Sequence, residues 1–324
     1  MSKKIVTVVG ATGTQGKGVI AAFRNNPSYH IRALTRSPTS ASALALSALG
    51  LEVVQADIND PSSLQAAFAG SHIIYAVTNF FEPFAALQSG PKALEVEVQQ
   101  GINLADAAAA TPTLEHYIWS TLPNASAISA GKYLIPHFEG KNRVDDYIKT
   151  KLPALWQKTT RFWVSYYSSN LAYPMFTPYL VPTAGKYVQF ANYAPGTLIR
   201  TVGDVGANVG PFVKAVVEQP DKTTRGAAVL AALPETYTAE ELLQTWARAR
   251  GVKAQLVQIS RAAFGELWPL WADEMGVMME FWEEFGERSW SVAGGGEGEG
   301  VLDAEALGLQ GLQGLEEAFR GLEV

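Results

Sequence analysis

The sequence of 324 residues contains no cysteine. This absence excludes disulfides, thiolate metal sites and a cysteine nucleophile. It also fits a reducing compartment, where disulfides rarely persist. We therefore predict a cytoplasmic protein and expect no metal site.

An excess of positive charge and long apolar runs are missing too. The chain has 25 Lys and Arg against 31 Asp and Glu, which gives a formal net charge of -6. Such a surface has no broad attraction for phosphate backbones, so direct binding of nucleic acid is not expected. No run reaches the roughly 20 apolar residues of a spanning helix, and Lys3 and Lys4 lead directly into the first predicted strand. We expect neither secretion nor insertion into a membrane.

The sequence does contain a glycine-rich turn after its first predicted strand, residues 5–9. Gly10, Gly13 and Gly16 follow this β-branched strand with the spacing G-x-x-G-x-x-G. The first glycine permits a sharp turn, the second permits close approach to a pyrophosphate, and the third permits close packing of the next helix. That helix, at 17–23, would present its amino end to the anion. The pattern also fits an ordinary strand-to-helix turn, but its context favours a dinucleotide site formed by Gly10, Thr12, Gly13, Thr14, Gln15 and Gly16.

Strand and helix patterns alternate through the first half of the chain. This alternation is typical of a right-handed, doubly wound parallel sheet, so we predict an α/β fold of the Rossmann type. Strands are predicted at 5–9, 30–35, 51–56, 73–77, 117–120 and 161–164, and helices at 17–23, 40–49, 60–68, 96–110 and 139–149.

The rhythm changes near residue 165. We predict a Rossmann domain over 1–165, with a returning segment at about 197–220, and a smaller α+β domain for the substrate or partner over 166–324. In this second part, a capping box at Thr238–Glu241 opens a helix that ends at Gly251.

The second part has three further features. A cluster of aromatic residues is interpreted as packed core rather than a ligand site; its members are Trp268, Trp271, Phe281, Trp282 and Phe285. A flexible glycine-rich link is predicted at 293–300. An amphipathic C-terminal helix is predicted to dock onto the body, or alternatively to bind a partner; it carries Leu312, Leu315, Phe319 and Leu322.

The end of the second predicted strand bears on the choice of cofactor. An acidic residue there would accept hydrogen bonds from the hydroxyls of the adenosine ribose, but the sequence has Arg36. The guanidinium of Arg36 suits the 2′-phosphate of NADP. Alternatively, Arg36 is a solvated loop arginine with no ligand. We predict NADP(H) as the cofactor. Asp57 either accepts a hydrogen bond from the adenine amino group or belongs to the turn before Pro61.

Several motifs of the chain together resemble the NmrA-like branch of the atypical short-chain dehydrogenases. The resemblance implies a Rossmann domain that prefers NADP and a smaller C-terminal domain. It also implies one of two functional kinds: redox sensors that bind a protein partner such as a transcription factor, or reductases that act on aromatic or enone-like natural products. The motifs that carry it are V-V-G-A-T-G-T-Q-G at 8–16, L-T-R at 34–36, V-T-N-F-F-E at 77–82, H-F-E-G-K at 137–141 and D-V-G at 204–206.

The ordinary short-chain dehydrogenase uses Tyr-x-x-x-Lys on a helix, but this chain has His137 and Lys141 at that spacing. A separation of four residues puts both side chains on one helical face. Lys141 would reach the nicotinamide ribose, and His137 would face the reacting group as a proton donor or only line the pocket. If the protein is a reductase, Lys141 or His137 is expected to supply the proton. Tyr133 is a further candidate acid, whereas the literal motif at Tyr147 and Lys151 is interpreted as coincidence.

Polar residues at the ends of other predicted strands complete the expected crevice. Ser120 stands where dehydrogenases place a serine that binds a substrate carbonyl, although a plain strand-end turn is the alternative. By the rule that ligands bind at the carboxyl ends of parallel strands, the following residues are expected beside the cofactor: Thr78, Asn79, Phe80, Tyr167 and Asn170.

Two main functions remain open on these grounds. The first is an NADPH-dependent reductase that gives hydride to a C=O, C=C or C=N bond of a small substrate. The second is a non-catalytic NADP sensor that binds a regulatory protein, and a cofactor-dependent non-redox enzyme is a third. Both main hypotheses predict NADP binding, and neither fixes the substrate or the oligomeric state.

Overall fold

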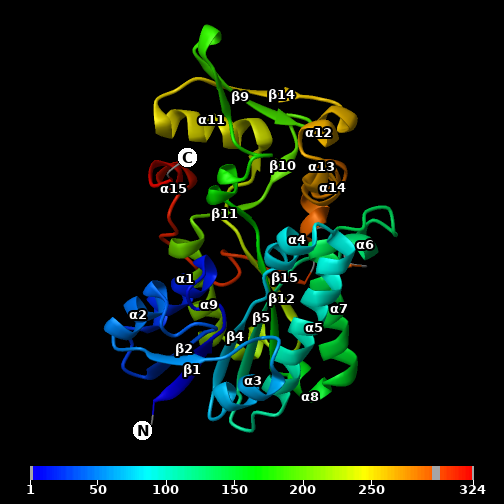
Figure 1. Ribbon diagram of the computed structural model, residues 1–324. Helices are drawn as coiled ribbons and strands as arrows, with labels where there is room; N and C mark the ends of the chain where they lie inside the picture. Colours follow the sequence, from blue (N-terminus) through cyan, green and yellow to red (C-terminus); the bar gives the residue numbers. More distant parts are fainter. Residues whose placement is uncertain (1–2, 294–299, 323–324) are drawn as a thin grey trace.

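The computed structural model describes residues 3–293 and 300–322. A large sheet forms its lower part in Figure 1, and a smaller α/β region forms the upper part. Of the predicted link at 293–300, residues 294–299 lie outside the described residues.

Eight parallel strands build the large sheet, in the order β15-β12-β6-β5-β4-β1-β2-β3. The strand order reverses beside β1, which pairs with β2 on one side and β4 on the other. This is the doubly wound arrangement expected from the sequence. The strands are β1 (Lys4–Val8), β2 (Tyr29–Thr35), β3 (Glu52–Gln55), β4 (Ile73–Ala76), β5 (His116–Thr121), β6 (Thr159–Val164), β12 (Ala227–Ala231) and β15 (Val301–Leu302).

Helices cover both faces of this sheet, as Figure 1 shows. Their apolar residues form two separate cores with the two faces of the strands. On one face lie α1 (Thr14–Phe23), α2 (Ala41–Ala48) and α9 (Val205–Glu218), and on the other lie α3 (Pro61–Phe68), α5 (Gly90–Ala109), α7 (Pro136–Lys151) and α8 (Pro153–Trp156).

Two glycines allow α1 and α9 to approach closely. A Cβ atom added at Gly210 would lie 2.3 Å from the carbonyl oxygen of Gly18. Since neither backbone can yield there, any larger residue would push the helices apart. This contact connects α9, which lies late in the sequence, to the first helix after the glycine turn.

The upper part contains a small three-stranded sheet and the helices around it (Figure 1). Its strands are β8 (Tyr179–Val181), β9 (Lys186–Ala191) and β14 (Ala254–Gln258), and α11 (Ala239–Arg250) packs beside them. The predicted capping box of α11 is present, and Gly251 ends the helix with a positive φ of 65°. The C-terminal helix α15 (Leu315–Arg320) docks by burying Leu315 and Phe319 in the same core, as predicted.

Short elements complete the chain. Those that precede α11 in the sequence are α4 (Phe81–Leu87), α6 (Ala125–Ile128), β7 (Tyr166–Tyr167), η1 (Ser168–Ala172), η2 (Pro182–Ala184), β10 (Leu198–Ile199), β11 (Thr201–Gly203), α10 (Pro220–Thr223) and β13 (Tyr237–Thr238). The remainder are α12 (Arg261–Leu267), α13 (Pro269–Trp271), the π-helical turn η3 (Ala272–Gly276), α14 (Val277–Phe285) and η4 (Gly286–Trp290).

The structure corrects the predicted organisation in three places. The strands β12 and β15 belong to the large sheet although they follow the predicted domain boundary. Local sequence patterns did not place them there, because their pairing partners lie far away in the sequence. Helix α5 begins at Gly90 rather than at 96, since Ser89 caps its amino end. The sequence reading also missed α4, whose first turn contains Pro83.

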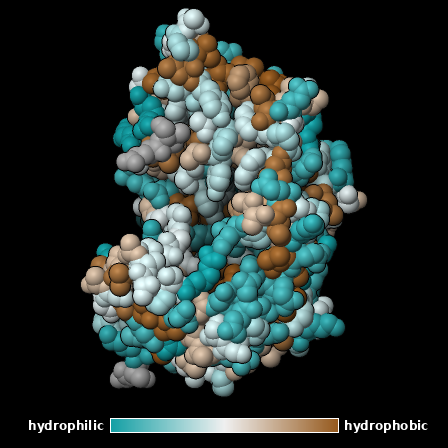
Figure 2. All heavy atoms as spheres, viewed as in Figure 1, coloured by the Kyte–Doolittle hydropathy of each residue, from teal (hydrophilic) through white to brown (hydrophobic). Residues whose placement is uncertain are grey.

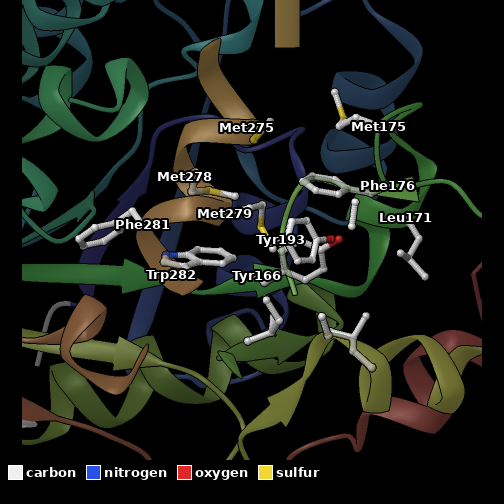
Figure 3. Packing of buried hydrophobic residues seen from close by; sticks show 14 of the residues in the cluster. Tyr166, Leu171, Met175, Phe176, Tyr193, Met275, Met278, Met279, Phe281 and Trp282 are labelled. Carbon is white, nitrogen blue, oxygen red and sulfur yellow. The ribbon is translucent and has the colours of Figure 1, made fainter. Parts of the chain in front are cut away.

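The aromatic and methionine-rich core of the upper part is drawn in Figure 3, where Met275, Met278, Phe281 and Trp282 project from one helical stretch. Phe281 and Trp282 are buried, and Trp268, Trp271 and Phe285 pack against the same core, as the interpretation as packed core expects. Trp282 also lines the cavity described below. Trp271 is only partly buried and packs against Phe81 and Phe84 of α4.

Candidate functional site

A cavity of about 680 Å³ lies over the carboxyl ends of the central strands, between the large sheet and the upper part. Figure 2 shows the surface hollowed between these two parts. The cavity brings together most of the residues expected from the sequence: Gly10, Thr12, Gly13, Thr14, Gln15, Gly16, Arg36, Thr78, Asn79, Phe80, Ser120, His137, Lys141, Tyr167 and Asn170.

The glycine turn forms one wall of the cavity. Gly10 has a positive φ of 63°, and the N–H of Gly13 donates to its carbonyl oxygen at 2.9 Å. A Cβ atom at Gly16 would lie 2.3 Å from that same oxygen. Helix α1 starts directly afterwards at Thr14, and no side chain caps its amino end. Its first N–H groups therefore remain available to an anion in the cavity.

Gln15 ties this turn to the neighbouring strands. Its Oε1 accepts hydrogen bonds from the hydroxyls of Tyr75 and Ser120, the latter at 2.9 Å, and its Nε2 donates to the Tyr167 hydroxyl at 2.6 Å. Ser120 thus lines the cavity, but its proton is directed to Gln15. In this arrangement it supports the turn rather than offering a free donor to a substrate carbonyl.

Lys141 is buried in a polar network below the cavity. Its Nζ lies 3.0 Å from Glu97 Oε1 and donates to Thr78 Oγ1 at 2.8 Å, and the Thr78 hydroxyl donates to Glu97 at 2.7 Å. The ammonium also lies 5.4 Å from the centre of the Trp119 ring. Glu97 is fully buried, and Lys141 and Thr78 both contact its Oε1.

The sequence reading missed Glu97, although a signal existed. Glu97 lies on α5 at helical spacing from Leu94, Gly101 and Leu104, on the face that the helix buries. A carboxylate on an apolar helical stripe indicates a buried partner of opposite charge.

His137 is the second residue of α7 and lines the same cavity. Its Nδ1 and its backbone N–H both meet Glu274 Oε1, the latter at 3.1 Å. Both side chains are buried, and the rings of Phe80 and Phe81 lie 5.8 and 5.5 Å from the imidazole. No hydrogen bond engages Nε2 within residues 3–293 and 300–322, so that nitrogen remains available to a ligand. Glu274 comes from the π-helical turn, and nothing in the sequence pattern pointed to it.

Arg36 forms an ion pair that the sequence did not predict. Both ends of its guanidinium meet the carboxylate of Glu82 in the first turn of α4, with Nη2 at 3.1 Å from Oε2. Both side chains are more than half exposed at the edge of the cavity. The expected phosphate-binding group is therefore at the cavity, but a carboxylate already engages it.

Two predicted site residues lie elsewhere. Asp57 does not line the cavity; its Oδ1 accepts hydrogen bonds from the backbone and side chain of Asn59, which corresponds to the turn alternative. Tyr133 precedes α7 and donates its hydroxyl proton to Glu284 at 2.6 Å, away from the cavity. Burial and the bond to Glu284 raise the pKa of this phenol, and a role of Tyr133 as the acid stays a prediction.

The literal Tyr-x-x-x-Lys motif is at the far end of α7, as interpreted from the sequence. Tyr147 is on the surface and donates to Asp106 at 2.8 Å. Neither Tyr147 nor Lys151 lines the cavity.

Apolar side chains from α4 and from segments after β6 also line the cavity. They come from segments separated widely in the sequence, so periodicity alone could not assemble them. They are Phe81, Tyr166, Tyr173, Met275, Met278, Trp282 and Trp290. Such a surface favours a flat or apolar ligand.

Two negative findings apply to the described part of the chain. Within residues 3–293 and 300–322, no helix has both the length and the apolar character to cross a membrane. In the same ranges, no three His, Asp or Glu side chains gather in a way that could hold a metal ion.

Known proteins resemble this chain in sequence and in fold. An NmrA-like family domain-containing oxidoreductase of Aspergillus campestris is 38% identical over 146 residues, which cover 45% of this chain and 42% of that protein. The match thus spans less than half of the relative's length.

Two solved proteins share the fold over nearly the whole chain. The negative transcriptional regulator NmrA in complex with NADP has a TM-score of 0.75 at 21% identity, covering 99% of this chain and 96% of that one. Its complex with NAD gives 0.77 at 21% identity with the same coverage. A quinone oxidoreductase of Escherichia coli complexed with NADPH gives 0.66 at 17% identity, covering 97% and 98%.

The family follows from the extent of the match. The model of the NmrA-like family matches residues 2–303, which include the glycine turn, α7 and most of the upper part. The fold neighbours agree with this assignment, and so do the motifs that line the cavity. The chain belongs to the NmrA-like family.

Proposed function

We propose that the protein is an NADPH-dependent oxidoreductase that reduces a C=O, C=C or C=N bond in a small, flat and apolar substrate. The observation that carries this proposal is a cavity lined both by a dinucleotide-type turn and by a group of aromatic and methionine side chains. His137 and Lys141 line the same cavity from one face of α7. The bound cofactor and the bound substrate would therefore lie next to each other at these two side chains.

The residues present fit NADP(H). The free amides at the start of α1 would bind the pyrophosphate, and Arg36 would bind the 2′-phosphate. Lys141 would contact the nicotinamide ribose from its position beside Thr78. The nicotinamide supplies a hydride when bound, and the protein has to supply the proton that completes the two-electron reduction.

His137 is the better placed proton donor. Glu274 holds the imidazole at Nδ1, which leaves Nε2 to carry a proton toward a substrate in the cavity. Lys141 is held by Glu97 and Thr78, so it is better suited to binding and orientation. Proton transfer from Nε2 to the substrate would leave a neutral ring that solvent reprotonates.

A non-catalytic NADP sensor remains the second candidate. The absent Tyr-x-x-x-Lys motif in the cavity favours it, and so does the likeness to NmrA, which is described as a negative transcriptional regulator. Such a sensor would bind the same dinucleotide and present a surface to a regulatory protein. Only turnover separates the two candidates.

The test combines binding with turnover. Calorimetric titration with NADPH, NADP, NADH and NAD would be followed by oxidation of NADPH at 340 nm with quinones, enones, aldehydes and imines. We expect NADPH to bind and at least one acceptor class to be reduced. Binding without oxidation of NADPH by any acceptor would contradict the reductase and support the sensor, whereas no binding would contradict both.

The role of His137 has its own control. We expect His137→Gln to lower kcat by about 100-fold while NADPH still binds, because general acid catalysis contributes about this factor. His30→Gln is the matched control, since His30 pairs with Glu52 on the surface and does not line the cavity. Equal kcat values for the two variants would exclude His137 as the acid.

A further inference from the structure

The ion pair of Arg36 and Glu82 connects the segments that follow the two strands flanking β1. Arg36 directly follows β2, and Glu82 follows β4. These strands are the two neighbours of β1, from which the glycine turn emerges. The pair therefore spans the edge of the cavity over the half where the adenosine of a dinucleotide would lie.

The contact occupies the groups that a phosphate would need. Each of the two guanidinium nitrogens Nη1 and Nη2 of Arg36 faces its own oxygen of Glu82. A guanidinium binds carboxylate and phosphate in the same two-pronged geometry, so the two anions compete for one edge of Arg36. The 2′-phosphate of NADP can engage this edge only after Glu82 has left it.

A dinucleotide without a 2′-phosphate makes no such demand. NAD has hydroxyls on its adenosine ribose, and Arg36 can then keep its carboxylate partner. Glu82 thus lowers the affinity for NADP without a matching effect on NAD. With NAD bound, the Glu82 carboxylate would still pair with the Arg36 guanidinium at the edge of the cavity.

We propose that Glu82 is a specificity-determining residue that narrows the preference for NADP over NAD by competing with the 2′-phosphate for Arg36. This inference rests on the proposed binding of a nicotinamide dinucleotide. Arg36 attracts the phosphate, and Glu82 sets how much of that attraction remains.

The experiment measures Kd values for NADP and NAD by calorimetry with wild type and Glu82→Gln. An exposed ion pair contributes up to about 1 kcal/mol, so we expect the ratio of the Kd for NAD to the Kd for NADP to rise about fivefold. The same titrations with adenosine 2′,5′-bisphosphate and AMP isolate the 2′-phosphate. Of these two ligands, only adenosine 2′,5′-bisphosphate, which carries the 2′-phosphate, should gain affinity in Glu82→Gln.

Glu95→Gln is the matched control. Glu95 forms an exposed pair with Arg143 at 2.9 Å, does not line the cavity, and changes the net charge equally when replaced. It should leave the ratio of Kd values unchanged. On an Arg36→Ala background, Glu82→Gln should change the ratio less than about twofold, because no guanidinium remains to compete for.

The outcomes separate this inference from the proposed function. Binding of both dinucleotides to wild type, with the same ratio in Glu82→Gln and Glu95→Gln, would overturn the role of Glu82 alone. A fivefold rise that persists on the Arg36→Ala background would also overturn it, since the effect would not pass through Arg36. Failure of wild type to bind either dinucleotide would overturn the proposed function as well.

Discussion

The buried pair of Lys141 and Glu97 permits a quantitative prediction about stability at the site. Replacing Lys141 by methionine keeps its apolar volume but removes the ammonium that pairs with the fully buried Glu97 carboxylate. Breaking a buried pair on one side costs about 3–5 kcal/mol. The Thr78 hydroxyl still donates to Glu97 at 2.7 Å, so we expect the lower end, about 3 kcal/mol. At roughly 2 °C for each kcal/mol, Tm should fall by about 6 °C.

The assay is urea unfolding followed by circular dichroism for Lys141→Met, Glu97→Gln and the double variant. The double variant contains no buried charge at this place, so it should recover most of the lost free energy of unfolding. Lys214→Met is the matched control, because Lys214 pairs with Glu218 at 3.8 Å on the surface. That variant should lose less than about 1 kcal/mol.

Two results would refute the reasoning. Equal free energies of unfolding for Lys141→Met and Lys214→Met would mean that Glu97 holds no charge that needs a partner. Equal free energies of unfolding for Lys141→Met and the double variant would mean that the loss comes from packing alone. The prediction also matters for catalysis, since lower activity of a Lys141 variant has to be measured below its unfolding transition before it is assigned to chemistry.

Two further predictions concern a buried acid and the glycine turn. Burial raises the pKa of Asp145 from 3.8 to about 7, so the stability from its bound proton is present below pH 4 and is lost as pH rises to 7. The free energy of unfolding of Asp145→Asn relative to wild type should therefore rise between pH 4 and 8, by up to about 4 kcal/mol in urea unfolding. The same difference between variant and wild type at both pH values would contradict this. Gly16→Ala would put a methyl group 2.3 Å from the carbonyl oxygen of Gly10, so calorimetry should show at least a tenfold loss of NADPH affinity. Gly196→Ala, which meets nothing within 4 Å, should bind as wild type does, and equal affinities of the two variants would exclude the steric argument.

Local signals in the sequence were sufficient for the first βαβ units. The β-branched run of β1, the glycine spacing after it and the start of α1 all depend on neighbours within a few residues. The capping box of α11 is equally local, and so is the spacing of His137 and Lys141 on α7. For this reason the fold class and most of the cavity wall could be predicted.

Long-range pairings were beyond such signals. The strands β12 and β15 are short and join the large sheet only because β6 provides an edge for β12, and β12 provides one for β15. The start of α7, in contrast, is a local signal. Tyr133 would share a face with Lys141 only if the helix began early, whereas Pro136 indicates a start at that residue, and α7 does begin at Pro136.

The sequence by itself determined the doubly wound sheet, the dinucleotide-type turn and the helix that carries His137 and Lys141, because each follows from periodicity and turn chemistry over short distances. Only the tertiary structure decided which carboxylate each of the three cationic or titratable site residues meets. Glu82, Glu97 and Glu274 reach Arg36, Lys141 and His137 from other helical segments. Ion pairs of this kind depend on how packed elements bring distant residues together, which no local pattern encodes.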